Sequence, residues 1–185
     1  MEISQTGIPG LVVVQPKVFT DNRGFFLETY SRRAFAEAGL DYDFVQDNHA
    51  RSVTKGVLRG LHFQRPPSAQ AKLVWVVRGA VFDVAVDLRR GSPTYGRWYG
   101  MELSAENFSR LMLPRGFAHG YVTLTENAEF MYKVDAPYSP ADDAGIAWND
   151  PDIAVRWPVT DPVLSEKDKA QPRLSQMESP FTYGG

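Results

Sequence analysis

Short apolar runs separated by glycine and proline are the feature that most constrains the fold of this chain. Between residues 72 and 134, β-branched and apolar side chains are dense, and turn-forming pairs recur at Gly91/Pro93 and Pro114/Gly116. We expect strands at residues 73–77, 81–88, 98–103, 110–113, 119–124 and 129–134. The Arg78-Gly79 pair predicts a β-hairpin between the first two, although Arg-Gly is a weaker turn signal than Asn-Gly. Many short strands with few helices predict an antiparallel sandwich or barrel.

The two ends of the chain are less regular. Before residue 72 we expect short strands near residues 12–14, 18–19 and 25–30, and one helix at 32–38 that Ser31 caps and Gly39 ends. After Trp157-Pro158 the chain contains further prolines, so we expect a tail that wraps over the body and could bring a functional side chain to a barrel mouth. There is no internal repeat or linker, and the length suits one domain spanning residues 1–185.

The charge composition excludes one class of protein and leaves another open. With 20 basic and 22 acidic side chains, the formal charge of −2 excludes a generally cationic nucleic-acid binder, whereas a local basic pocket for an anionic small molecule stays open. The absence of cysteine excludes disulfides and thiolate ligands and fits a reducing compartment. No signal peptide is evident, and no apolar segment approaches the roughly 18 residues of a membrane helix. We expect a cytoplasmic protein without nucleic-acid or membrane partners.

Residues 56–64 concentrate polar groups on an apolar, strand-like segment. Arg59 and His62 lie within it, and Lys72 follows on the next strand. Charge at core-like positions costs free energy unless it is paired or used, so we interpret this region as an active site. Arg59 and His62 are three residues apart, which strict alternation would send to opposite faces. Gly60 between them suggests a β-bulge that would bring them together.

The strand that begins at Lys72 is apolar on both faces. Lys72 and Val74 share one face, and Leu73 and Trp75 share the other. We therefore expect sheet or helix cover on both sides, with Lys72 at the end of an otherwise buried row.

The three histidines do not predict a metal site. Small metal-binding barrels commonly use histidines at i and i+2, but the residue two after His62 is Gln64. His62 and His119 lie beside glycines in apolar settings, which favours a functional role, whereas His49 is expected to be peripheral. We expect no metal.

The remaining groups suit proton transfer. A neutral imidazole has a pKa of about 6.5 and can accept a proton near neutral pH. A carboxylate on its other nitrogen would fix the tautomer, and Asp168 on the tail is a candidate. A lysine in a partly apolar pocket could stabilise a developing oxyanion. Tyr132 could be a general acid or simply a core aromatic, and the residues alone leave both open.

No glycine-rich phosphate loop or dinucleotide motif is present. Any phosphate would therefore have to meet arginines, and Arg23 and Arg59 are candidates for forked contacts to its oxygens. Arg23 could equally be an exposed turn residue.

A specific combination of motifs is distributed along the chain. Its members are FTDNRGFFLE (residues 19–28), QDNH (46–49), GVLRGLHFQ (56–64), KLV (72–74), FDVAVDLR (82–89), SPTYG (92–96), PRGFAHG (114–120), WND (148–150) and LSEKD (164–168). From about residue 3 to about residue 175, the chain resembles the dTDP-4-dehydrorhamnose 3,5-epimerase family. The resemblance implies an all-β, cupin-type jelly-roll antiparallel barrel with a few short helices and a wrapping tail. It also implies a homodimer that needs no cofactor.

The family's reaction inverts C3 and C5 of dTDP-4-keto-6-deoxy-D-glucose through enolates and gives dTDP-4-keto-L-rhamnose. By resemblance, His62 is the base paired with Asp168, Tyr132 is the acid on the opposite face, and Lys72 stabilises the enolate oxygen. The resemblance also implies nucleotide or sugar contacts for a further set of residues, which are Arg23, Glu28, Gln46, Asn48, Arg59, His119, Tyr138 and Asp143. Tyr138 is the position that would stack on thymine.

Departures from the family pattern are few. Ala71 replaces a glycine before Lys72, and Asp143 stands where a longer glutamate is common. Residues 181–185 have no recognised counterpart.

Three alternatives to this function stay open. One is a mono-epimerase that inverts C3 or C5 alone, because the retained residues do not decide how many centres react. Another is a non-catalytic cupin that binds a sugar nucleotide, and the last is a metal-dependent cupin isomerase or dioxygenase.

Overall fold

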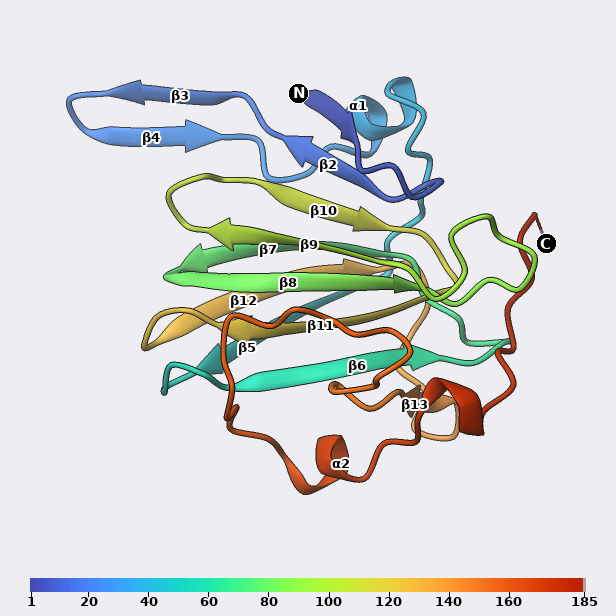
Figure 1. Cartoon of the computed structure of the whole chain (residues 1–185). Coiled ribbons are helices and arrows are strands. Elements are labelled where there is room, and N and C mark those ends of the chain that lie inside the picture. The colour runs from blue at the N-terminus through green and yellow to red at the C-terminus, as the bar shows by residue number, and fades with distance from the viewer. Residues whose placement is uncertain (185) are drawn as a thin grey trace.

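Two antiparallel sheets face each other and enclose most of the core (Figure 1). The computed structural model describes residues 1–184, and Gly185, the last residue of the expected domain, lies outside the described residues. All pairs of the named strands are antiparallel. The expected all-β barrel of the jelly-roll type, with few helices, is confirmed.

The elements have the following bounds. The six-stranded sheet consists, in spatial order, of β1 (Glu2–Gln5), β2 (Val12–Gln15), β10 (Arg110–Leu113), β7 (Lys72–Arg78), β12 (Ala128–Val134) and β5 (Gln46–Ser52). The five-stranded sheet consists of β13 (Asp143–Gly145), β6 (Leu58–Gln64), β11 (Phe117–Thr123), β8 (Ala80–Asp87) and β9 (Trp98–Ser104). The remaining elements are the hairpin of β3 (Val18–Asp21) and β4 (Gly24–Leu27), the helices α1 (Arg32–Glu37) and α2 (Glu166–Lys169), and the 3₁₀ turn η1 (Leu174–Gln176).

Strand β7 is buried on both faces, as its sequence predicted. Val74 and Val76 point between the sheets and belong to the central cluster of apolar side chains. Leu73 and Trp75 point to the outer face, where Phe35 of α1 covers them. Each fully buried side chain of this size contributes roughly 1.5–3 kcal/mol. Apolar packing on both faces therefore stabilises β7 in the interior of its sheet.

The hairpin expected between residues 73–77 and 81–88 is wrong. β7 lies between β10 and β12, whereas β8 lies between β11 and β9 in the facing sheet. The chain crosses between the sheets at Gly79, whose φ is +70° and where a Cβ would lie 2.2 Å from Thr125 Oγ1. Because the middle of each strand is buried on both faces, their sequence pattern suits a corner between sheets as well as a hairpin.

Strand β5 was not expected from its sequence. Its residues QDNHARS are mostly polar, yet each pairs with a residue of β12. β5 ends its sheet, so polar side chains on it do not need to enter an apolar core. β1 and β13 were also not expected, and both are short strands at sheet edges.

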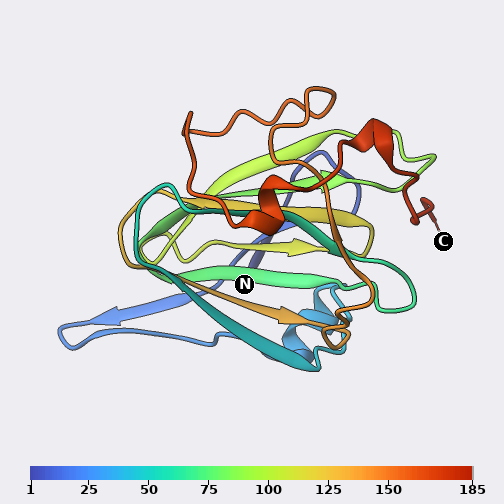
Figure 2. The same cartoon turned by 90° about the horizontal axis from the view of Figure 1, so that it is seen from below.

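The tail after Trp157 wraps over the body, as expected. Figures 1 and 2 show it in orange to red along the outside of the five-stranded sheet, with α2 beside β6. The outer apolar side chains of that sheet, among them Val84 and Val86, pack against Trp157 and Phe181 and against Ile153 just before the tail. The tail thus covers a face that would otherwise expose apolar side chains to water.

The expected helix at 32–38 is present as α1. Its cap is Ser31, whose Oγ accepts a hydrogen bond from the Ala34 backbone N–H at 3.4 Å. Among residues 1–184, no helix is both long and apolar enough to cross a membrane.

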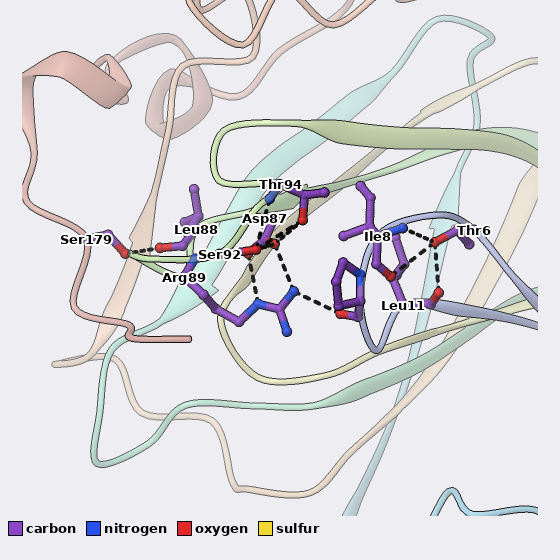
Figure 3. A network of polar contacts seen from close by, with 10 residues as sticks. Thr6, Ile8, Leu11, Asp87, Leu88, Arg89, Ser92, Thr94 and Ser179 are labelled. Carbon is purple, nitrogen blue, oxygen red and sulfur yellow. Dashed lines mark hydrogen bonds and ion pairs between the residues drawn. The ribbon is translucent and has the colours of Figure 1, made fainter. Parts of the chain in front are cut away.

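A buried carboxylate ties three parts of the chain together (Figure 3). The Asp87 side chain is fully buried and accepts hydrogen bonds from the Arg89 guanidinium at 2.8 Å, from Ser92 Oγ at 2.6 Å and from Thr94 Oγ1 at 2.7 Å. Arg89 also donates to the Pro9 carbonyl at 2.8 Å. Ser179 Oγ donates to the carbonyl of Leu88, so the network joins the N-terminal loop, the end of β8 and the tail.

We predict that Asp87→Ala destabilises the protein by roughly 3–5 kcal/mol, because the Arg89 guanidinium would lose its partner in a buried site. Chemical denaturation would measure this change in the free energy of unfolding. Asp21→Ala is the matched control, because it removes the similar Asp21–Arg23 pair from the exposed hairpin and should change stability little. Equal stability of the two variants would contradict the assignment of Asp87 as a structural anchor.

Candidate active site

A cavity of about 430 Å³ opens between the two sheets, a size suited to a small-molecule ligand. The five-stranded sheet and the six-stranded sheet form opposite walls of it, and the tail closes one side. The polar side chains that line it are Arg59, His62, His119 and Tyr121 from the five-stranded sheet, Lys72 and Tyr132 from the six-stranded sheet, and Ser165 and Asp168 from the tail. The structure therefore brings the four expected catalytic residues, His62, Tyr132, Asp168 and Lys72, into one cavity.

Arg59 and His62 line the same cavity because β6 contains the expected bulge. His62 pairs with His119 and Arg59 pairs with Tyr121, so β6 has one more residue in this interval than β11. Gly60 has a φ of +136°, and a Cβ there would lie 2.5 Å from Gly120 Cα. A side chain at position 60 would push β6 and β11 apart, so glycine is required where the two backbones come this close.

His62 is held by a carboxylate from the tail. Its Nε2 lies 2.5 Å from Asp168 Oδ1, and the Asp168 side chain is 4% exposed. Burial alone would raise the pKa of Asp168, but hydrogen bonds from His62 and Ser165 lower it below its ordinary value. The carboxylate is therefore ionised and can only accept. Nε2 must carry the proton, which leaves the Nδ1 lone pair as the basic nitrogen.

The position of Asp168 depends on how the tail meets β6. The backbone N–H of Leu58 donates to the Val163 carbonyl at 2.9 Å, and Val163 forms a bridge with Val57. Ser165 then caps α2, and Asp168 is the buried residue of that helix. The expectation that the tail brings a side chain to the barrel mouth is confirmed for this contact.

Tyr132 lies on the wall opposite His62. It projects from β12 in the six-stranded sheet, whereas His62 projects from β6 in the other sheet. Burial raises the pKa of the Tyr132 phenol, partly offset by the charge of Arg59, so the hydroxyl keeps its proton at neutral pH. A group bound between the walls would have a base on one side and a proton donor on the other.

Lys72 lies beside Tyr132 on the same wall. Its Nζ is 6.0 Å from the centroid of the Tyr132 ring. Burial lowers the pKa of Lys72 to about 8, and the negative charges of Asp143 and Asp83 limit the decrease. The amine is therefore mostly charged at pH 7 and places a cation in a partly apolar cavity.

A second imidazole–carboxylate pair lies on the neighbouring strands, where His119 of β11 is opposite His62 of β6. His119 Nε2 is 2.9 Å from one carboxylate oxygen of Asp83 and 3.1 Å from the other, and Asp83 is fully buried. Asp83 was not among the expected site residues. The signal that could have found it is its place on the same face as Asp87 in an otherwise apolar strand.

Four expected substrate contacts, Gln46, Asn48, Tyr138 and Asp143, form a polar group of their own and are not among the residues that line the cavity. Gln46 Nε2 donates to Asn48 Oδ1 at 2.8 Å, and the Tyr138 backbone N–H donates to Gln46 Oε1 at 3.1 Å. The Tyr138 hydroxyl donates to Asp143 Oδ2 at 3.0 Å. Lys167, which the sequence analysis missed, forms an ion pair with Asp143. Tyr138 is 56% exposed, so its ring is accessible to a ligand.

Arg23 and Glu28 are not brought to this cavity within one chain. Arg23 lies between β3 and β4, and its side chain is 85% exposed and paired with Asp21. Glu28 follows β4 and lines a different hollow, next to Phe26 and Phe35. The roles of both residues stay predictions. For residues 1–184, no three His, Cys, Asp or Glu side chains are grouped so that they could hold a metal ion.

Comparisons with known proteins agree on one family. The family model described as dTDP-4-dehydrorhamnose 3,5-epimerase matches residues 5–176. The dTDP-4-dehydrorhamnose 3,5-epimerase of Pseudomonas aeruginosa is 54% identical over 171 residues, which cover 91% of this chain and 93% of that protein.

Solved structures extend this similarity to the fold. The dTDP-6-deoxy-D-glucose-3,5-epimerase RmlC of Legionella pneumophila, solved with dTDP-4-keto-L-rhamnose, is 44% identical with a TM-score of 0.94 and covers 100% of this chain and 99% of its own. ChmJ of Streptomyces bikiniensis, a 3′-monoepimerase solved with dTDP-quinovose, is 35% identical with a TM-score of 0.85. The match covers 91% of this chain and 86% of ChmJ.

We predict that Lys72→Met raises the melting temperature at pH 7 by about 2–4 °C, which corresponds to ~1 kcal/mol. The pKa of Lys72 is lowered to about 8 from 10.5, so folding disfavours its charged form, and the unfolded chain binds more protons between these values. The stability of the parent therefore rises relative to the variant as pH increases from 8 towards 10.5. Thermal unfolding across this range should show the gap narrowing. Two results would contradict the idea that burial of the Lys72 ammonium costs stability. One is a variant less stable than the parent at pH 7, and the other is a difference in melting temperature that widens as the pH rises.

Proposed function

The chain belongs to the dTDP-4-dehydrorhamnose 3,5-epimerase family, and we propose that His62, Tyr132 and Lys72 perform its chemistry in the cavity between the sheets. The chain is an isomerase that converts dTDP-4-keto-6-deoxy-D-glucose to dTDP-4-keto-L-rhamnose in dTDP-rhamnose biosynthesis. The observation that best supports the residue roles is a base and a proton donor on opposite walls, with a cation beside the donor. An inversion by proton transfer needs this arrangement.

The C4 ketone makes the hydrogens on C3 and C5 acidic. His62 Nδ1 removes the proton from one of these carbons, and the electron pair moves into the carbonyl to give an enolate. The Lys72 ammonium stabilises the new charge on O4, a type of contact that contributes about 10²–10³ in rate. Tyr132 then returns a proton to the opposite face of the same carbon, which inverts it. The first inversion leaves a proton on His62 and a phenolate at Tyr132, and proton exchange with water restores the neutral imidazole and the phenol. Repetition at the second carbon then completes the reaction.

Asp168 has two roles in this scheme. It holds the imidazole in the tautomer that leaves Nδ1 free, and it stabilises the imidazolium that forms when a proton is taken. Base, acid and oxyanion stabiliser are thus all side chains of this chain. We propose that the reaction requires no metal and no added cofactor.

Inversion of a single carbon is the second candidate, because the similar ChmJ is a 3′-monoepimerase. The residues around the cavity do not by themselves limit the number of carbons that react. The outcome depends on whether the sugar ring can turn so that both C3 and C5 reach His62.

We predict that turnover in heavy water places deuterium at both C3 and C5 of the product, which NMR would detect. Label at one carbon alone would favour the mono-epimerase. His62→Asn should abolish exchange at both carbons while substrate binding, measured by calorimetry, persists. If the parent protein binds the sugar nucleotide but exchanges no proton, the chain is a non-catalytic binding protein. Loss of parent activity on chelation would instead favour the metal-dependent alternative.

We also propose that the chain acts as a homodimer. The β3–β4 hairpin projects from the body (Figures 1 and 2), and Phe19, Phe25 and Phe26 on it are 53%, 61% and 70% exposed. Aromatic side chains gathered on a projecting hairpin are typical of a protein interface. Arg23 lies at the turn of this hairpin, outside the cavity of its own chain. If Arg23 and Glu28 contact the nucleotide, they do so in the site of the partner.

We predict that two inactive variants complement each other. In a heterodimer of Arg23→Ala and His62→Asn chains, one site combines an intact His62 with an intact Arg23 from the partner. Purified heterodimers should therefore show about half of the wild-type activity, whereas both parent homodimers should be strongly impaired. The experiment requires co-expression with two different tags. Heterodimers no more active than their parents, or a monomeric wild type in ultracentrifugation, would contradict the proposal.

We propose further that residues 1–185 work as one domain in the cytoplasm. The apolar clusters include side chains from Ile8 to Phe181, which supports a single folding unit. The absence of cysteine suits a reducing compartment.

A further inference from the structure

We propose that Ser165 is a positioning residue for proton transfer, because its hydroxyl holds the Asp168 carboxylate against His62. The inference rests on the proposed role of His62 as the base. Ser165 lines the cavity, but its function is exerted through Asp168 rather than on the substrate.

Two hydrogen bonds join Ser165 to Asp168. The Ser165 hydroxyl donates to Asp168 Oδ2 at 2.7 Å, and its oxygen accepts from the Asp168 backbone N–H at 3.1 Å. The other carboxylate oxygen, Oδ1, accepts from His62 Nε2. One oxygen of Asp168 therefore faces the barrel and the other faces the tail. Rotation of the carboxylate about its Cβ–Cγ bond would break both contacts.

The local structure makes this restraint necessary. Helix α2 has four residues, and Asp168 is its one buried member, while Glu166, Lys167 and Lys169 are exposed. A helix of this length has little stability of its own. The Asp168 side chain therefore needs a local partner to keep its orientation. The donated O–H bond also favours the ionised carboxylate, the form that can hold the His62 proton.

A simpler role for Ser165 is to cap α2 alone. Ser31 offers a matched comparison, because it caps α1 through its Oγ and the Ala34 N–H at 3.4 Å, and the Ser31 hydroxyl has no carboxylate partner in the described structure. A cap stabilises a helix whether or not the helix holds a catalytic side chain. The two roles differ in whether the hydroxyl must donate a hydrogen bond.

Three substitutions of Ser165 separate these roles. Ser165→Ala removes both the cap and the donor, Ser165→Asp keeps a capping acceptor without a donor, and Ser165→Thr keeps both. We expect kcat to fall about tenfold or more in the Ala and Asp variants, with KM within about twofold of the parent, and the Thr variant to recover most of kcat. Ser31→Ala should leave kcat unchanged. Full activity of Ser165→Asp would overturn the proposal and leave Ser165 as a cap.

A spectroscopic test does not depend on turnover. In the substrate-free protein, the His62 Nε2 proton held by Asp168 should give a downfield ¹H resonance, and three histidines make its assignment practicable. We expect this resonance to persist in Ser165→Thr and to be lost through rapid exchange in Ser165→Ala. Its persistence in Ser165→Ala would overturn the proposal. Failure of the parent protein to exchange C3 and C5 protons would refute the proposed function, whereas this resonance would still report whether Ser165 holds the pair.

Discussion

The hydrogen bond between His62 and Asp168 is the contact on which the site depends. The two residues are 106 positions apart, one on a central strand and the other on the tail that wraps the barrel. The bond sets the imidazole tautomer and so decides which nitrogen is basic. Packing of the tail on the outer face of the five-stranded sheet brings the carboxylate to the imidazole, and in the proposed mechanism this contact prepares the base.

The cavity concentrates groups that do not favour folding. Lys72 is charged at neutral pH although burial lowers its pKa, and Asp83, whose charge limits that decrease, is fully buried. Such groups persist where chemistry needs them and where the rest of the fold supplies stability. Here the apolar packing of the two sheets and the network around Asp87 provide that support. In the proposed mechanism, stability and activity therefore make opposite demands on Lys72.

The predicted elements and the observed fold differ where pairing is non-local. The pattern of residues 72–88 correctly predicted two strands and their buried faces, yet it wrongly joined them as a hairpin, because apolar alternation does not specify which strand lies alongside. β5 has a polar sequence and became a strand through pairing with β12 along its length. At Gly60, by contrast, the sequence predicted the structure correctly. Arg59 and His62 could share a face only if a bulge lay between them, and the structure contains that bulge.

By itself, the sequence determined the strand-rich class and the motifs that identify the family, because these depend on residue type and local spacing. The resemblance to that family then suggested the candidate base, acid and oxyanion stabiliser. The tertiary structure alone decided that His62 and Tyr132 line one cavity from different sheets and that Asp83 pairs with His119. It also decided that Arg23 lies outside its own chain's cavity. Each of these depends on which distant segments meet, and contacts between distant segments follow from the packing of the whole chain rather than from any local pattern.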